Sequence, residues 1–207
     1  TYLVKLPTQG RFYPEGHSCH GLSTIEIRYM TAKEEDILTS ENLLKEGVAV
    51  NRAVQNMILD SRIDIRDLLV QDRNALVVAA RITGYGSTYA TSIVCPECGI
   101  KDRFEFDLDE GMESALAETN KLLDNLTLPQ VDEQGNMLLY FTTPVTQTVL
   151  GCKLLTGFDE EHLAQETYLK PLNNSVVTSL LRRLIVSVDG NSNPLVVANY
   201  VHQMPTR

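Results

Sequence analysis

The residues with the clearest chemical potential are two cysteines three positions apart, Cys95 and Cys98, in the sequence Cys-Pro-Glu-Cys-Gly. Thiolates at this spacing bind tetrahedral zinc in knuckle-shaped turns, where the glycine helps backbone N–H groups to reach the sulfurs. Structural zinc takes four ligands, and the sequence has no second Cys-x-x-Cys pair. The pair therefore predicts either part of a zinc site or a turn that keeps its shape without metal.

Further zinc ligands would have to come from other parts of the chain or from a neighbouring chain. Cys19 and His20 are the first candidates, and His17 and Cys152 are further ones. A polar loop without metal is the simpler interpretation of residues 17–20. A redox role is less favoured, because thioredoxin-type chemistry places the first cysteine at the N-terminus of a helix. The cofactor prediction is thus either none or one zinc ion.

Other catalytic motifs are missing from the sequence. It contains no Gly-x-Ser-x-Gly, no phosphate-binding loop and no His-Glu-x-x-His. Four aspartates, Asp60, Asp64, Asp67 and Asp72, lie where helices are expected to begin, so helix capping explains them better than acid–base catalysis. We therefore predict that the protein is not an enzyme.

The cysteines are expected at the tip of a hairpin that follows a buried helix. Apolar residues recur at helical spacing over residues 75–82 on nearly all sides, and Gly84 is expected to end this helix. Residues 89–94 read as a strand. Residues 103–108 alternate, with Phe104, Phe106 and Leu108 on one side, which predicts a half-exposed return strand.

The rest of the chain predicts short helices and small sheets. Thr31 and Glu34 match a capping box at the start of one helix, and a further short helix is expected over residues 65–70. Asn174 is expected to cap a long helix whose apolar face runs from residue 176 to residue 188. Asn193 and Pro194 are typical of the start of a last helix, which would reach Met204. The predicted fold class is α+β, with helical bundle-like segments, a Cys-x-x-Cys β-hairpin and small antiparallel sheets.

The domain organisation predicted from these patterns has three parts. Residues 1–22 form an extended N-terminal arm, residues 23–110 the helical segment with the hairpin, and residues 111–207 a second α+β segment that could be continuous with the previous one. The arm either lies on a partner or packs on its own domain. Its apolar anchors are Tyr2, Leu3, Leu6, Phe12 and Tyr13.

Composition limits the classes of partner. The 207 residues carry a formal net charge of −9, which disfavours a general nucleic-acid binder, because such a protein needs clustered cations to neutralise phosphates. No apolar run is long enough to cross a membrane, and neither a signal peptide nor a disulfide framework is evident, so we expect folding in a reducing cytoplasm. The cysteine pair keeps one alternative open, a zinc-knuckle nucleic-acid-binding module.

Several segments together resemble the baseplate proteins of T4-type contractile-tailed bacteriophages. The resemblance covers nearly the whole chain, and the order and spacing of the segments make it specific. The segments are Leu6-Pro7-x-x-Gly10-x-x-Tyr13-Pro14, residues 25–39, Asp72–Leu76, Arg81–Gly86, Cys95-Pro-x-Cys98-Gly99, Leu155–Gly157 and Ile185–Gly190.

The resemblance implies a non-enzymatic component of the baseplate hub, or an assembly chaperone for the hub. Its partners would be other phage baseplate and hub proteins, and a homo-oligomer is compatible with this role, whereas nucleic acid and membrane are not expected. It would act in the host cytoplasm during assembly and, if it stays in the particle, in the virion tail. Relatives often continue past the Met204–Pro205 region with a second Cys-x-x-Cys, so the resemblance leaves the completion of a zinc site open.

Overall fold

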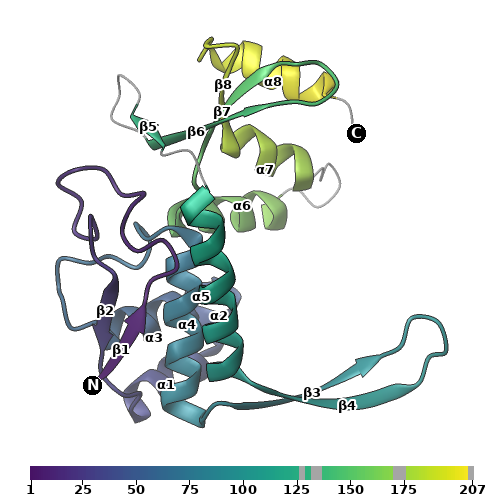
Figure 1. The fold of residues 1–207 in the computed structure, drawn as a ribbon. Coiled ribbons are helices and arrows are strands. Elements are labelled where there is room, and N and C mark those ends of the chain that lie inside the picture. The colour runs from purple at the N-terminus through teal and green to yellow at the C-terminus, as the bar shows by residue number, and fades with distance from the viewer. Residues whose placement is uncertain (126–128, 132–136, 170–175, 205–207) are drawn as a thin grey trace. The chain divides into compact units, whose positions relative to one another are not determined.

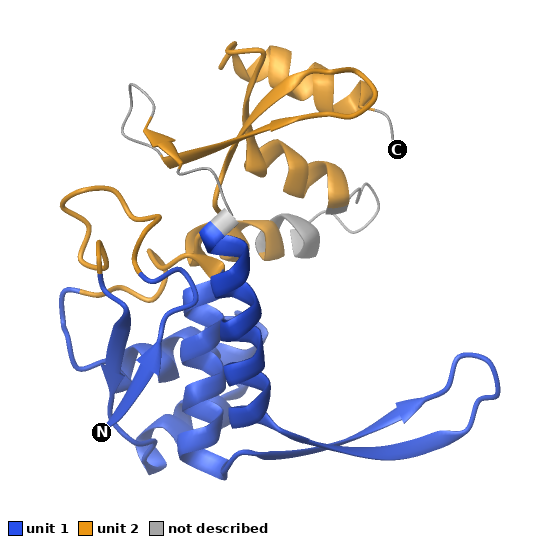
Figure 2. Ribbon diagram, viewed as in Figure 1, with its two compact units in different colours: residues 1–9, 22–62, 71–126 blue, residues 10–21, 63–70, 127–207 orange. Residues whose placement is uncertain are grey.

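The computed structural model describes residues 1–125, 129–131, 137–169 and 176–204 (Figure 1). It confirms the α+β class, with small antiparallel sheets and, within these ranges, eight helices. Two compact units are built from interleaved segments (Figure 2). Unit 1 consists of Thr1–Gln9, Leu22–Arg62 and Gln71–Leu126, and unit 2 of Gly10–Gly21, Ile63–Val70 and Thr127–Arg207. The three-part division at residues 22 and 110 stays a prediction.

Unit 1 begins with a two-stranded sheet. Strand β1 (Tyr2–Lys5) pairs antiparallel with β2 (Thr24–Ile27), and Val4 and Ile27 are buried beneath it. The first residues of the predicted arm are therefore part of this sheet. The helices of the unit are α1 (Ala32–Thr39), α2 (Glu41–Lys45), α3 (Ala49–Met57), α4 (Val70–Tyr85) and α5 (Leu108–Asn125). The first residue of α4, Val70, is counted with unit 2.

Helix α1 starts with the predicted capping box. The Glu34 carboxylate accepts the Thr31 backbone N–H at 3.0 Å and the Thr31 hydroxyl at 2.6 Å. Arg28 also donates two hydrogen bonds to the same carboxylate, at 2.9 and 2.5 Å, although the Glu34 side chain is 0% exposed. These bonds lower the pKa of Glu34 to about 2, while burial acts in the opposite direction. Glu34 thus keeps its negative charge although it is buried, because both of its carboxylate oxygens accept hydrogen bonds.

A second buried carboxylate holds the N-terminal segment on helix α4. Asp72 accepts the Thr8 backbone N–H at 3.0 Å and the Thr8 hydroxyl at 2.5 Å, and both residues are buried. The sequence predicted a helix cap for Asp72. Asp72 lies in the first turn of α4, and the structure shows in addition this contact between residues that are far apart in the chain.

Helix α4 differs from its prediction in two details. It continues past Gly84 to Tyr85, and Gly86, with a φ of +83°, is the residue in the left-handed conformation that follows it. Gly84 packs closely against Met30, because a Cβ there would lie 2.6 Å from the Met30 sulfur and the methionine side chain would have to shift. The burial is also one-sided: Leu76 is fully buried, whereas Val78 is only partly buried.

The predicted helix over residues 65–70 is wrong. Residues 65–69 form turns and a bridge, and Val70 is already the first residue of α4, because several backbone groups of this segment of unit 2 pair with residues 155–158. The Gly157 N–H donates to the Leu68 carbonyl at 3.0 Å, and the Phe158 N–H donates to the Arg66 carbonyl at 2.9 Å. The Asp64 side chain accepts the Arg66 N–H at 2.9 Å, which closes a turn at the start of the segment.

Unit 2 contains a four-stranded antiparallel sheet, with the strand order β5–β6–β7–β8. Its strands are β5 (Gln130–Val131), β6 (Met137–Thr142), β7 (Val149–Lys153) and β8 (Ile185–Val188). Its helices are α6 (Gly157–Leu169), α7 (Val176–Leu184) and α8 (Pro194–Gln203). The core that joins β7, β8 and α8 consists of Leu150, Cys152, Ile185, Val188, Val197 and Val201.

The single long helix predicted for residues 176–188 is wrong. Helix α7 ends at Leu184, and the apolar run that follows pairs with β7 as strand β8. Three of the four residues of β8 are β-branched, which suits a strand. The predicted cap Asn174 lies outside the described residues. The start of α8 is confirmed, since Asn193 accepts the Leu195 N–H at 2.9 Å.

Candidate functional site: the Cys-x-x-Cys hairpin

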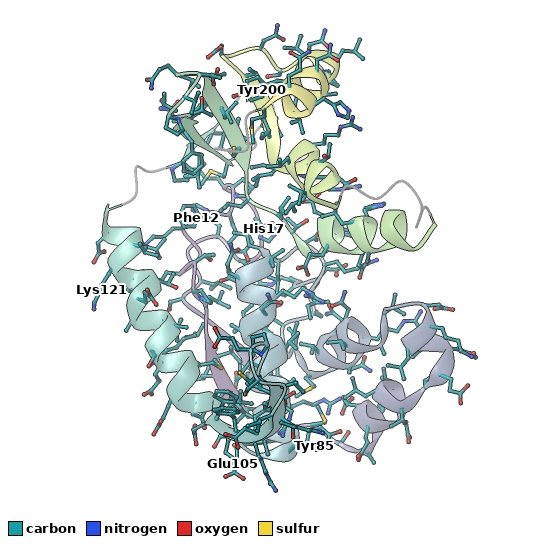
Figure 3. The ribbon with its side chains drawn as sticks, turned by 90° about the vertical axis from the view of Figure 1, so that its right-hand side faces the viewer. Phe12, His17, Tyr85, Glu105, Lys121 and Tyr200 are labelled. Carbon is teal, nitrogen blue, oxygen red and sulfur yellow. The ribbon has the colours of Figure 1, made fainter. Side chains whose placement is uncertain are left out.

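The predicted hairpin is formed by β3 (Thr88–Val94) and β4 (Lys101–Asp107), and it projects away from the helices of unit 1 (Figure 1). Every residue of β4 is exposed, and so is β3 apart from Thr91, which is half-buried. Figure 3 shows the side chains of the same hairpin, with Glu105 labelled. The hairpin is thus held by its own ladder and by its base.

The two faces of the hairpin differ in chemistry. Tyr89 lies opposite Phe106 and Thr91 lies opposite Phe104, and residues directly opposite each other share a face. Ile93 belongs to the same face, which we call the aromatic face: Tyr89, Ile93, Phe104 and Phe106, each 42–47% exposed. Asp102, opposite Ile93, also lies on this side. The other face carries mostly small, polar and charged side chains, among them Arg103 and Glu105, and also Val94.

The expectation that one side of the return strand is covered by the chain itself is wrong. The alternation of Phe104 and Phe106 with polar residues is as predicted, but the two rings are 42% and 47% exposed, so the described part of unit 1 covers this side only in part. Leu108, the third residue of the predicted apolar side, is the first residue of helix α5. An amphipathic hairpin with an uncovered apolar face is typical of a surface that another molecule covers.

The tip of the hairpin holds Cys95 and Cys98 close together in a tight turn. The Cys95 N–H donates to the Ile100 carbonyl, and the Gly99 N–H donates to the Cys95 carbonyl, each at 2.9 Å. Gly99 has a φ of +69°, which explains the glycine after the second cysteine. Backbone N–H groups of Cys98 and Glu97, followed by the Cys98 thiol, donate to the Cys95 sulfur and lower its pKa.

The base of the hairpin is fixed by Arg81 of helix α4. Its guanidinium donates to the Gly86 carbonyl at 2.9 Å and lies 5.1 Å from the centre of the Tyr85 ring and 5.9 Å from that of Tyr89. On the other strand, Asp107 accepts backbone N–H groups at the start of α5. That of Glu110 contributes most to lowering the Asp107 pKa. These contacts therefore fix the direction in which the hairpin extends from the end of α4 and the start of α5.

The other candidate metal ligands lie in unit 2, whereas the cysteine pair lies in unit 1. Cys19 is fully buried, and Cys152 is buried in strand β7, where desolvation raises the pKa of its thiol. Within the described ranges, no three His, Cys, Asp or Glu side chains gather in a way that could hold a metal ion. The zinc site stays a prediction, and the residues present supply two of the four ligands that it needs.

Residues 10–21 form an ordered loop with its own hydrogen bonds. The His17 ring stacks on Tyr13 with centroids 4.6 Å apart, and His17 Nδ1 accepts the Cys19 N–H at 3.0 Å. Burial lowers the pKa of His17, so its neutral form is favoured. His20 Nδ1 lies 2.7 Å from the Tyr13 carbonyl oxygen. These contacts give the two histidines structural partners.

With Phe12, His17 also lines a cavity of about 390 Å³ in unit 2 (both are labelled in Figure 3).

The five predicted anchors of the arm have different environments. Leu6, Phe12 and Tyr13 are buried, and the Tyr13 hydroxyl accepts the Leu69 N–H at 3.0 Å. These three residues therefore pack on the chain itself, which is one of the two interpretations that the sequence left open. Leu3 is 65% exposed, and the Tyr2 hydroxyl donates to Asp109 at 3.2 Å. Partner binding by Tyr2 and Leu3 stays a prediction.

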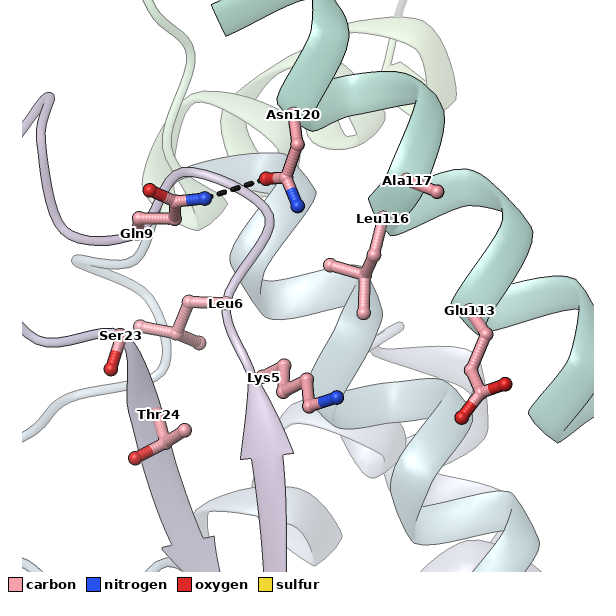
Figure 4. Close-up of a pocket in the computed structure, with 9 residues that line it drawn as sticks. All are labelled: Lys5, Leu6, Gln9, Ser23, Thr24, Glu113, Leu116, Ala117 and Asn120. Carbon is pink, nitrogen blue, oxygen red and sulfur yellow. Dashed lines mark hydrogen bonds between the residues drawn. The ribbon is translucent and has the colours of Figure 1, made fainter.

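A second surface feature of unit 1 is a pocket of about 480 Å³ between β1 and α5 (Figure 4). Leu6 and Leu116 line it, and Gln9 Nε2 donates to Asn120 Oδ1 at 2.6 Å beside it. Its lining contains no cysteine, histidine or aspartate. Helix α5 has no buried side chain among those described, so it covers the unit loosely. Lys5 of β1 and Glu113 of α5 also line the pocket.

Comparison with known proteins identifies the family. A family model described as "T4 bacteriophage base plate protein" matches residues 1–187. The chain belongs to this family. No curated protein and no solved structure matches the chain. Membership associates this baseplate protein with the tail of a bacteriophage and with a structural or assembly role there. None of its described helices combines the length and apolar character needed to cross a membrane.

Proposed function

We propose that this baseplate protein works at the baseplate hub, as a hub component or as an assembly chaperone, through protein–protein contacts and without catalysis. The observation that carries the contact role is the aromatic face of the β3–β4 hairpin, whose four apolar side chains are each 42–47% exposed. Aromatic side chains dominate the binding energy of protein interfaces, because they bury a large area with few rotatable bonds. Its partners are other baseplate or hub proteins, met in the host cytoplasm during assembly.

The charges of the hairpin favour a protein partner over nucleic acid. A zinc-knuckle nucleic-acid-binding module would need cations around the cysteines to neutralise phosphates. The hairpin has two cations, Lys101 and Arg103, and four carboxylates, Glu97, Asp102, Glu105 and Asp107. This surplus of negative charge repels phosphates, while the aromatic face remains available for an apolar partner surface.

Complementation of a phage that lacks this gene tests the proposal. The double variant Phe104→Ser, Phe106→Ser removes the aromatic side chains, and Arg103→Ser, Glu105→Ser is the matched control on the other face of the same strand. We expect the first variant to remain folded by circular dichroism, to lose co-purification with hub proteins and to reduce the yield of infectious phage at least tenfold. The control should restore infectivity.

Two results would contradict the proposal. Equal rescue by both variants would show that the aromatic face makes no essential contact. Normal contractile, infectious tails without the protein would remove the hub role altogether.

A further inference from the structure

We propose that the hairpin tip is half of a zinc site, and that a second copy of this chain supplies the other half. Each copy would contribute Cys95 and Cys98, so that four thiolates surround one zinc ion between two tips. This inference goes beyond the hub role and does not depend on it, because it concerns how two copies of the chain are joined.

The tip of the hairpin has the shape of a metal-binding turn. Cys95 and Cys98 lie close together in one tight turn. Two backbone hydrogen bonds close this turn, from the Cys95 N–H to the Ile100 carbonyl and from the Gly99 N–H to the Cys95 carbonyl, each at 2.9 Å. The turn therefore sets the spacing of the two thiols before metal binds, and a preformed pair loses little freedom on binding.

The described part of the chain does not complete the site. No third ligand lies near the pair among the residues that the structure describes. A tetrahedral site is compatible with a two-fold axis through the metal, which divides four ligands into two identical pairs. A second Cys95–Cys98 pair is then the simplest source of the missing ligands, since it needs no other partner.

Apolar side chains beside the cysteines suit a shared, water-poor site. Val94 and Ile100 flank the tip and are 57% and 66% exposed, so two tips that meet would cover them. Zinc with four thiolates carries two net negative charges. Lys101 lies opposite Val94 in the ladder, beside the tip, so each copy brings one cation near the metal, while Glu97 between the cysteines brings one carboxylate.

Zinc titration of the reduced, metal-free protein tests the inference. The molar mass is followed by size exclusion with light scattering, and the bound metal by elemental analysis. We expect the mass to double at one zinc per two chains and to return to that of one chain with a chelator. Cobalt in place of zinc should give the visible absorption of tetrahedral thiolate coordination.

Single substitutions at the tip separate this arrangement from others. Cys95→Ser and Cys98→Ser should stay monomeric with zinc but keep the far-ultraviolet circular dichroism of the parent, since the tip is solvent-accessible. Cys152→Ala, a cysteine outside the hairpin, should still dimerise. One zinc per chain at unchanged mass, no retained zinc, or zinc-dependent dimers of Cys95→Ser would each overturn the inference. None of these results bears on whether the aromatic face contacts hub proteins.

Discussion

The helical body of unit 1 and its β3–β4 hairpin carry similar apolar side chains in opposite environments. Leu76 of helix α4 is fully buried, whereas Phe104 and Phe106 of β4 are 42% and 47% exposed. The body also pairs its buried carboxylates, as Glu34 and Asp72 show. The difference teaches that an apolar pattern tells which residues share a face, but not whether the same chain covers that face. Stability should depend on the body, and partner binding on the hairpin.

A matched pair of truncations tests this contrast most strongly. Leu76→Ala should lower the free energy of unfolding by about 2–5 kcal/mol, because it leaves a cavity in a packed interior. Phe104→Ala removes a larger side chain but should cost less than about 1 kcal/mol, because much of that surface is already in water. Urea denaturation followed by circular dichroism measures both. A larger loss for Phe104→Ala would show that the hairpin packs on the body in solution.

The sequence predicted those parts of the fold that local chemistry decides. The capping box at Thr31 and the helix start at Asn193 depend on a few neighbouring residues, and both form. Residues 65–70 and 185–188 were assigned to helices because their apolar spacing fits one. In the structure their backbone groups pair with distant segments, and no local pattern reveals such partners.

The candidate site was predictable to a similar extent. The spacing of Cys95 and Cys98 placed them at a hairpin tip, which the structure shows. Exposure of the aromatic face could not be predicted, because alternation looks the same whether a face is covered by the chain or by a partner. The contact between Asp72 and Thr8 was also missed, since it joins residues 64 positions apart.

A smaller effect is expected when the charge of the buried Glu34 is removed. Glu34→Gln loses the charged partner of Arg28 and should reduce stability by about 1.5–3 kcal/mol, the contribution typical of hydrogen bonds to charged groups. The neighbouring exposed Glu35→Gln is the matched control and should change little. Urea midpoints at neutral pH measure both variants. Equal midpoints would mean that the buried ion pair does not stabilise the body.

The same carboxylate predicts a pH dependence. Folding lowers the pKa of Glu34 from 4.5 to about 2, so its stabilisation is fully present above pH 4.5 and is lost as the pH falls from 4.5 towards 2. The parent protein should therefore lose more stability across this window than Glu34→Gln does. Parallel pH profiles for the two proteins would contradict the assigned pairing.

The smallest effect is expected for an ion pair of similar length that lies in water. Arg62 Nη2 is 2.7 Å from Asp60 Oδ2, and this contact lowers the pKa of Asp60 to about 2, but the Arg62 side chain is 77% exposed. Solvent and salt screen such a pair, and the long arginine side chain loses freedom when it forms. Arg62→Ala should therefore leave the urea midpoint unchanged within the error of the measurement, at low and at high salt. A loss as large as that of Glu34→Gln would show that the distance between the charges, and not their burial, decides what an ion pair contributes in this unit.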